Sequence, residues 1–138
     1  MKIISGGQTG VDRAALDTAI ALGIPHGGWC PRGRLAEDGR IPDCYQLRET
    51  ETAEYAVRTE RNVLESNATL ILYRGNLSGG TKLTAELAER HGRPYLLVDL
   101  AAPLPVTDVL TWLDAHRAAV LNVAGPRESQ PPGIAAQA

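Results

Sequence analysis

Short apolar runs in this sequence alternate with segments whose apolar residues recur every three or four positions. Four runs have the length and residue types of buried strands: 2–5, 68–73, 95–100 and 119–123. Four segments have the period of an amphipathic helix: 11–22, 53–64, 81–91 and the stretch around 106–113. Residues 28–30 could add a further short strand. Because strands that alternate with helices form a mostly parallel sheet with right-handed crossovers, the pattern predicts a Rossmann-like three-layer α/β/α fold with a sheet of about five strands.

The length and composition fit one compact domain. At 138 residues the chain has room for a single core, so we expect one ligand-binding domain over residues 1–138. Hydrophobic residues make up 43% and charged residues 22%, which excludes a long disordered tail or a coiled coil. The sequence shows neither a signal-like start nor an apolar run long enough to span a membrane, so we expect a cytoplasmic protein with no membrane partner.

Charge and residue usage argue against several binding classes. A net charge of −2 and a pI near 5.9 argue against a broad nucleic-acid footprint, and the absence of Phe leaves little material for stacking bases. Cys30 and Cys44 are too few for a disulfide framework, and His26, His91 and His116 stand alone in the sequence. We therefore expect no nucleic-acid partner and no metal site built from the protein's own side chains.

Three glycine-rich turns follow predicted strands and form the candidate ligand site. They are Gly6-Gly7-Gln8-Thr9-Gly10, Ser78-Gly79-Gly80-Thr81 and Gly125-Pro126-Arg127-Glu128-Ser129. The carboxyl ends of parallel strands meet at one edge of a sheet, where open α/β folds bind ligands. Glycine lets backbone N–H groups approach an anion, and the helix that follows adds a partial positive charge. Together the turns predict a phosphate-binding site, although each alone is also compatible with an ordinary turn.

Two common nucleotide-binding patterns are absent from the sequence. Lys82 follows Gly80-Thr81 without the spaced glycine of a Walker A loop, and the first turn is not a G-x-G-x-x-G. An ATPase, or a dehydrogenase that binds NAD or FAD in the usual manner, is therefore disfavoured.

A long loop over 31–50 interrupts the alternation of strands and helices. A loop of this length in a small domain usually serves a site, so it is a candidate lid or binding loop. Guanidinium groups suit the binding of phosphate, and the basic candidates are Arg32, Arg34 and Arg40 in the loop with Arg13, Lys82 and Arg127 elsewhere. Two alternatives stay open. The loop could be a solvated excursion, or its arginines could pair with Glu37, Asp38 and Asp43.

Candidates for catalysis are few. Asp12 and Glu37 are weak candidates for a catalytic carboxylate, although an acid at the position of Asp12 also stabilises a helix N-terminus. Glu86 is expected to face solvent. Asn122 and Glu128 could recognise the edge of a sugar or a base. These residues favour a binding protein over an enzyme.

Four segments resemble the family named putative molybdenum carrier proteins, a circularly permuted YpsA-like branch of the SLOG superfamily. They are 6–17 (GGQTGVDRAALD), 28–39 (GWCPRGRLAEDG), 79–84 (GGTKLT) and 121–129 (LNVAGPRES). The segments follow one another in the family's order, and the likeness extends nearly from end to end of the chain.

The resemblance implies a Rossmann-like domain that binds a phosphorylated pterin or a nucleotide-like ligand. Molybdenum cofactor (molybdopterin) fits that description, and its metal would arrive within the cofactor. A homo-oligomer is compatible with the wider superfamily. The ligand-binding residues indicated by the turns, the loop and the resemblance are Gly6, Gly7, Gln8, Thr9, Gly10, Arg13, Arg32, Gly33, Arg34, Gly79, Gly80, Thr81, Lys82, Asn122, Gly125, Pro126, Arg127, Glu128 and Ser129.

The same superfamily contains phosphoribohydrolases, which release a base from a nucleoside monophosphate and carry a P-G-G-x-G-T-x-x-E signature. Gly80-Thr81 would align with its Gly-Thr, which places Thr84 where those enzymes have an acid. A nucleotide N-glycosidase, or a sensor of a nucleotide-derived ligand, is therefore the alternative function. A hydrolase would need another carboxylate, such as Asp12 or Glu37.

Overall fold

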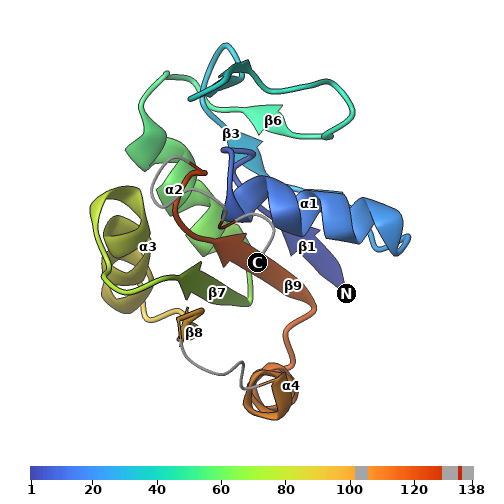
Figure 1. Cartoon of the computed structure of the whole chain (residues 1–138), viewed down its shortest axis with the longest axis vertical. Coiled ribbons are helices and arrows are strands. Elements are labelled where there is room, and N and C mark those ends of the chain that lie inside the picture. The colour runs from blue at the N-terminus through green and yellow to red at the C-terminus, as the bar shows by residue number, and fades with distance from the viewer. Residues whose placement is uncertain (102–105, 129–133, 135–138) are drawn as a thin grey trace.

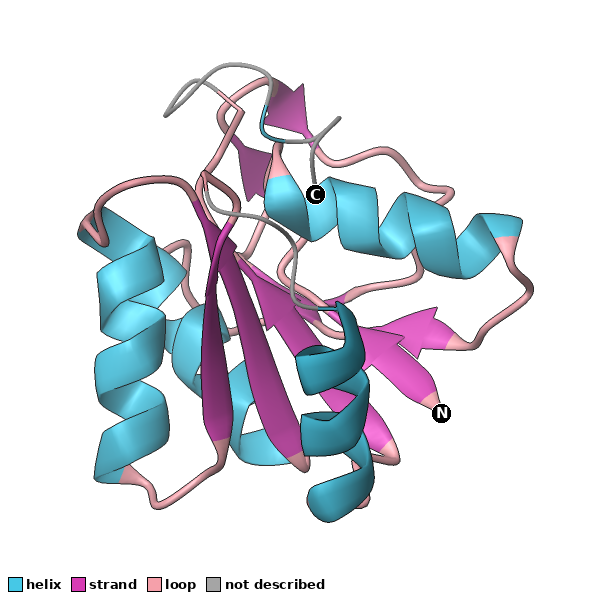
Figure 2. Ribbon diagram, turned by 60° about the horizontal axis from the view of Figure 1, so that its bottom comes forward, coloured by secondary structure: helices cyan, strands magenta, loops and turns pink. Residues whose placement is uncertain are grey.

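A five-stranded parallel sheet forms the centre of the computed structural model, which describes residues 1–101, 106–128 and 134 (Figures 1 and 2). The strands lie in the order β2-β1-β9-β7-β8, and every neighbouring pair is parallel. Their bounds in that order are His26–Gly27, Lys2–Ile4, Val120–Ala124, Ala68–Tyr73 and Tyr95–Asp99. The predicted Rossmann-like sheet is confirmed.

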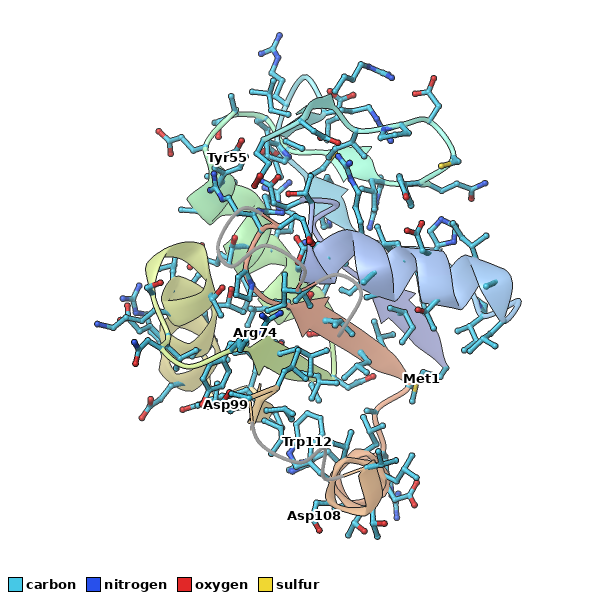
Figure 3. The ribbon with its side chains drawn as sticks, viewed as in Figure 1. Met1, Tyr55, Arg74, Asp99, Asp108 and Trp112 are labelled. Carbon is cyan, nitrogen blue, oxygen red and sulfur yellow. The ribbon has the colours of Figure 1, made fainter. Side chains whose placement is uncertain are left out.

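Helices cover both faces of the sheet. Helices α1 (Val11–Ala21) and α4 (Val106–Ala115) lie on one face, and α2 (Tyr55–Glu65) and α3 (Gly79–Arg90) pack together on the other. On the α1 and α4 face, Val11 joins Leu121 and Val123 of β9 in an aliphatic core. Trp112 lies between α4 and the sheet, whereas Asp108 points away from it (Figure 3). In the described part of the chain, no helix is long and apolar enough to cross a membrane.

The segment between α1 and α2 departs most from the prediction. The short strand expected within residues 28–30 is present as β3 (Trp29–Cys30), but it pairs with β6 (Arg48–Glu49) outside the main sheet. The edge of the main sheet is formed by β2, which ends at Gly27. Gly28 makes the break: its φ is +126°, and a Cβ there would overlap the carbonyl oxygen of Ser5. Strands of two residues are too short to show a hydrophobic period.

The loop predicted over 31–50 is folded. Strands β4 (Leu35–Ala36) and β5 (Gly39–Arg40) form an antiparallel hairpin within it, and β6 returns the chain to β3. A small second core lies beneath it, in which Ile41 and Tyr45 pack with Leu16 of α1. The loop is therefore a folded segment packed on α1 and not a solvated excursion.

Candidate functional site

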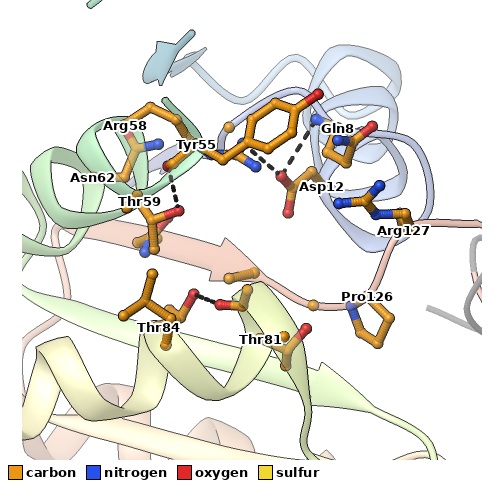
Figure 4. Close-up of a pocket in the computed structure, with 18 of the residues that line it drawn as sticks. Gln8, Asp12, Tyr55, Arg58, Thr59, Asn62, Thr81, Thr84, Pro126 and Arg127 are labelled. Carbon is orange, nitrogen blue, oxygen red and sulfur yellow. Dashed lines mark hydrogen bonds and ion pairs between the residues drawn. The ribbon is translucent and has the colours of Figure 1, made fainter. Parts of the chain in front are cut away.

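A pocket of about 320 Å³ opens at the carboxyl ends of β1, β7 and β9 (Figure 4). All three glycine turns contribute to its wall, through Gly6 and Gln8, through residues 78–81 and through residues 125–127. Helix α2 supplies the facing wall with five residues: Tyr55, Ala56, Arg58, Thr59 and Asn62. Parallel α/β sheets bind ligands at this position, so we treat this pocket as the candidate site.

A buried ion pair lies in the wall of the pocket. Asp12, in the first turn of α1, accepts hydrogen bonds through Oδ2 from Arg58 Nη1 and from the backbone N–H of Gln8, each at 3.3 Å. The two charged side chains are 7% and 12% exposed, respectively for Asp12 and Arg58. Arg58 fits there because Gly6 has no side chain, and a Cβ at Gly6 would overlap its guanidinium. Burial raises the pKa of Asp12 above its ordinary value, against the opposing influence of Arg58.

The N-terminus of α3 offers hydrogen-bond donors to the pocket. Ser78 precedes the helix without a side-chain cap, and the first backbone bond of the helix runs from Lys82 N–H to Ser78 O. The N–H groups of Gly79, Gly80 and Thr81 therefore have no acceptor among the described residues. An uncapped helix N-terminus of this kind is a ready anion-binding site.

Two N–H groups of the first glycine turn, and the one that follows the turn, have acceptors within the protein. The backbone of Gln8 donates to Asp12, that of Thr9 donates to Oε1 of Gln8, and that of Val11 donates to the carbonyl of Pro126. Gly10 allows this last contact, since its φ is +82° and a Cβ there would overlap Pro126 O. These contacts leave Gln8 and Thr9 without an N–H for a ligand, whereas the N–H groups of residues 79–81 have no acceptor among the described residues.

The third turn places a cation beside the pocket. Arg127 lines the pocket, with Nε 3.9 Å from Oε2 of Glu37 and the guanidinium carbon 5.9 Å from the centre of the Tyr55 ring. The next backbone N–H, of Glu128, donates to Oγ1 of Thr9, which ties the third turn to the first. Ser129, the last residue predicted in this turn, lies outside the described residues.

Most of the other predicted basic residues lie outside the pocket. Arg13 makes a bidentate ion pair with Asp38 and donates from Nε to Gly7 O, which fastens the loop to the first turn. That ion pair lowers the pKa of Asp38. Arg40 pairs with Asp43, as the ion-pair alternative held. Three predicted ligand residues, Arg32, Gly33 and Lys82, are exposed and do not line the pocket.

Arg34 is buried inside the loop. Its guanidinium donates to four backbone carbonyls, those of Ile41, Pro42, Tyr45 and Leu47. The residue adopts φ +54°, which is uncommon for a residue with a side chain. The structure thus places Arg34 where it organises the loop, away from the pocket.

Sequence reasoning missed the contribution of α2. Arg58 and Asn62 are four residues apart and share one face of α2. Asn62 is buried, and its side chain accepts a hydrogen bond from the backbone N–H of Trp29 and donates one to the carbonyl of Trp29. A polar stripe at helical spacing was the available signal, but such a stripe usually faces solvent. Glu86 is exposed, as predicted.

The acidic chemistry of the pocket rests on one residue. Thr84 lines the pocket at the position that the hydrolase signature gives to an acid, and its hydroxyl donates to Gly80 O at 2.8 Å. Asp12 is the single carboxylate among the described lining residues. No cluster of three or more His, Cys, Asp or Glu side chains able to hold a metal occurs in the part of the chain that the structure describes.

Comparison with known proteins agrees with the fold. The model of the circularly permutated YpsA SLOG family matches residues 3–138. The chain is also similar to the crystal structure of a protein from Syntrophus aciditrophicus named "putative molybdenum carrier protein". The two are 51% identical with a TM-score of 0.93, over 99% of this chain and 88% of that one. No curated protein matches the chain at a significant level.

Proposed function

The chain belongs to the circularly permutated YpsA SLOG family, and on that basis we propose that its pocket binds a small phosphorylated ligand for storage or transfer. The ligand is a pterin phosphate or a nucleotide-like molecule. Its phosphate lies at the N-terminus of α3 and its ring extends toward Asp12 and α2.

The uncapped N-terminus of α3 is the observation that carries the proposal. Residues 79–81 line the pocket, and their three N–H groups have no acceptor among the described residues. A helix N-terminus stabilises an anion by about 0.3 to 1 kcal/mol through its dipole, and direct N–H hydrogen bonds add to that. Arg127 lies in the same wall and can supply a charge-assisted hydrogen bond.

Molybdenum cofactor is one ligand of this chemical class. The name of the similar protein from Syntrophus aciditrophicus supports this identity. The donors of α3 fit a phosphate, and the buried side chains of Asp12 and Asn122 fit a hydrogen-bonding ring such as a pterin. No His or Cys is among the described lining residues, so the metal would be held by the cofactor itself. When bound, the cofactor would supply a redox-active metal centre for delivery to another protein.

A nucleotide N-glycosidase is the second candidate, and the environment of Asp12 favours it. A buried carboxyl group with a raised pKa, placed inside a pocket, suits general acid or base catalysis. Steady release of free base from a nucleoside monophosphate, abolished in Asp12→Asn, would establish this activity. If nucleotides of a panel bind to the protein but none is hydrolysed, the result would exclude the N-glycosidase for those nucleotides and favour the carrier function.

The first experiment is to identify the small molecule that purifies with the protein. The protein is denatured, the released compounds are analysed by mass spectrometry, and molybdenum is measured on the same sample. A phosphorylated pterin with near-stoichiometric molybdenum would establish the carrier, whereas a nucleotide without molybdenum would move the function to a nucleotide sensor or hydrolase.

A pair of variants then tests the assigned anion site. Arg127→Gln should weaken the binding of the identified compound by about tenfold or more, because it removes a charge-assisted hydrogen bond. Arg40→Gln is the matched control, since Arg40 is 59% exposed and pairs with Asp43 outside the pocket. Equal affinities of Arg127→Gln and the native protein would count against the site.

A further inference from the structure

The two ends of the pocket differ in the hydrogen-bonding groups they present. Figure 4 shows Thr59 and Thr84 at the end opposite to Arg127 and Pro126. Thr59 Oγ1 donates its proton to Tyr55 O at 2.9 Å, and Thr84 Oγ1 donates to Gly80 O at 2.8 Å. With these protons directed at backbone carbonyls, both threonines offer lone pairs to a ligand.

Asp12 adds an acceptor between these threonines and Arg127 (Figure 4). Its Oδ2 receives the hydrogen bonds of Gln8 and Arg58, whereas Oδ1 makes neither contact and points into the pocket (Figure 4). An ionised carboxylate is an acceptor only. The pocket wall therefore presents several acceptors to the ring of the ligand, namely Oδ1 of Asp12 and the hydroxyl oxygens of the two threonines.

Arg58 is the donor beside these acceptors. Its Nη1 goes to Asp12, and its Nε is buried without a hydrogen-bond partner among the described residues. A guanidinium has donors only, so a ligand group that meets Arg58 must be an acceptor. Asn122, which sends one amide N–H toward Thr69, can offer either a donor or an acceptor.

One donor, Arg58, beside several acceptors is complementary to a ring edge that has one acceptor next to more than one donor. We propose that the ring of the ligand is a 2-amino-4-oxo pyrimidine ring, as in guanine and pterin. Its carbonyl oxygen meets Arg58, and its ring N–H and amino group meet Oδ1 of Asp12 and the threonine lone pairs. Adenine offers one amino donor beside a ring nitrogen, and cytosine and uracil have more acceptors than donors along this edge. The inference rests on the proposed function and narrows its ligand class.

Calorimetric titration of matched ligand pairs tests the ring independently of the phosphate. GMP and IMP differ only by the 2-amino group, and the monophosphates of 6-hydroxymethylpterin and 6-hydroxymethyllumazine differ at the same ring position. We expect the amino compound of at least one pair to bind about tenfold or more tightly than its partner, the effect of one charge-assisted hydrogen bond. The pair that shows the preference identifies the source, a nucleotide or a pterin.

Other ligands separate the ways in which the proposals could fail. Guanosine, which lacks the phosphate, should bind much more weakly than GMP. If both pairs show equal affinities within them, or if AMP binds as tightly as GMP, the ring assignment is wrong while phosphate binding stands. If none of the phosphorylated compounds binds, the proposed function and the ring assignment both fall.

A substitution ties the preference to the residue. Asp12→Asn keeps the shape of the side chain but replaces an acceptor oxygen with an amide, so it should remove the preference for the 2-amino compound. Asp108→Asn, on the exposed face of α4, should retain it. A preference that persists unchanged in Asp12→Asn would overturn the role of Asp12.

Discussion

Replacing Arg58 with Met should destabilise the protein strongly at neutral pH. Methionine keeps most of the side-chain volume but removes the positive charge beside Asp12. With Arg58 and Asp12 only 12% and 7% exposed, water can compensate little of the loss. Removing one partner of a buried ion pair typically costs about 3 to 5 kcal/mol, because the remaining charge stays buried and uncompensated. That is a large part of the roughly 5 to 15 kcal/mol by which such domains are stable.

The destabilisation should depend on pH through Asp12. Burial already raises the pKa of Asp12 in the folded protein, so its contribution to stability is lost as the pH rises through that value. Without Arg58, which lowers the pKa, the folded-state value rises further, and each additional unit costs about 1.4 kcal/mol once the carboxyl is ionised. At lower pH, where Asp12 is protonated in both proteins, the difference between Arg58→Met and the native protein should narrow.

Urea denaturation followed by circular dichroism measures both effects. Unfolding free energies of the native protein, Arg58→Met and the double variant Asp12→Asn/Arg58→Met are compared between about pH 8 and pH 5. The double variant should recover much of the unfolding free energy lost in Arg58→Met, because no buried charge remains at this position. Its stability should no longer vary with pH through the ionisation of Asp12. A loss below about 1 kcal/mol in Arg58→Met at pH 8, or a loss independent of pH, would refute the reasoning.

Three further predictions concern the loop, the turns and binding. Arg34→Ala should destabilise the loop by more than about 2 kcal/mol and make it sensitive to limited proteolysis, because four carbonyls lose a charged donor. The control Arg40→Ala should lower the stability by at most about 1 kcal/mol. Gly125→Ala should lower the unfolding free energy by about 1 to 3 kcal/mol in urea denaturation, since its Cβ would overlap a carbonyl oxygen of β7. Gly80→Ala is the control in the same assay and should not destabilise the protein, because the space around Gly80 is open. Ligand affinity, measured by titration at several pH values, should fall as the pH drops through the raised pKa of Asp12. The protonated carboxyl loses acceptor capacity, while Arg58 and Arg127 stay charged. An affinity that does not change with pH would argue against a contact between the ligand and that carboxylate.

The main sheet could be predicted from the sequence because its elements are long enough to show a period. Strand β7 spans Ala68–Tyr73, the run recognised from its apolar residues, and α1 begins at the predicted residue. The two-residue strands of the 31–50 loop carry no such signal. Their pairing depends on backbone contacts and on Arg34, whose partners are carbonyl oxygens that every residue possesses.

The pocket was only partly predictable for a related reason. Glycine turns after strands are visible in a sequence, and the structure brings all three to one pocket. The wall from α2 was not visible, because a helical Arg such as Arg58 looks like a solvent-facing residue until its partner is known. Asp12, forty-six residues earlier in the chain, is that partner, and only the packing of α2 across β9 brings the two together.

The distribution of the arginines explains how a chain with a negative net charge can keep a pocket suited to an anion. Arg34 and Arg13 hold the loop to itself and to the first turn, and Arg58 compensates Asp12. These three cations are used within the fold, so none adds a net positive charge to the pocket. Arg127 lines the same pocket as the uncapped N-terminus of α3, is 40% exposed and lies 3.9 Å from Glu37. A phosphate at the N-terminus of α3 would offer Arg127 a charge-assisted partner and would leave the contacts of Arg13, Arg34 and Arg58 intact.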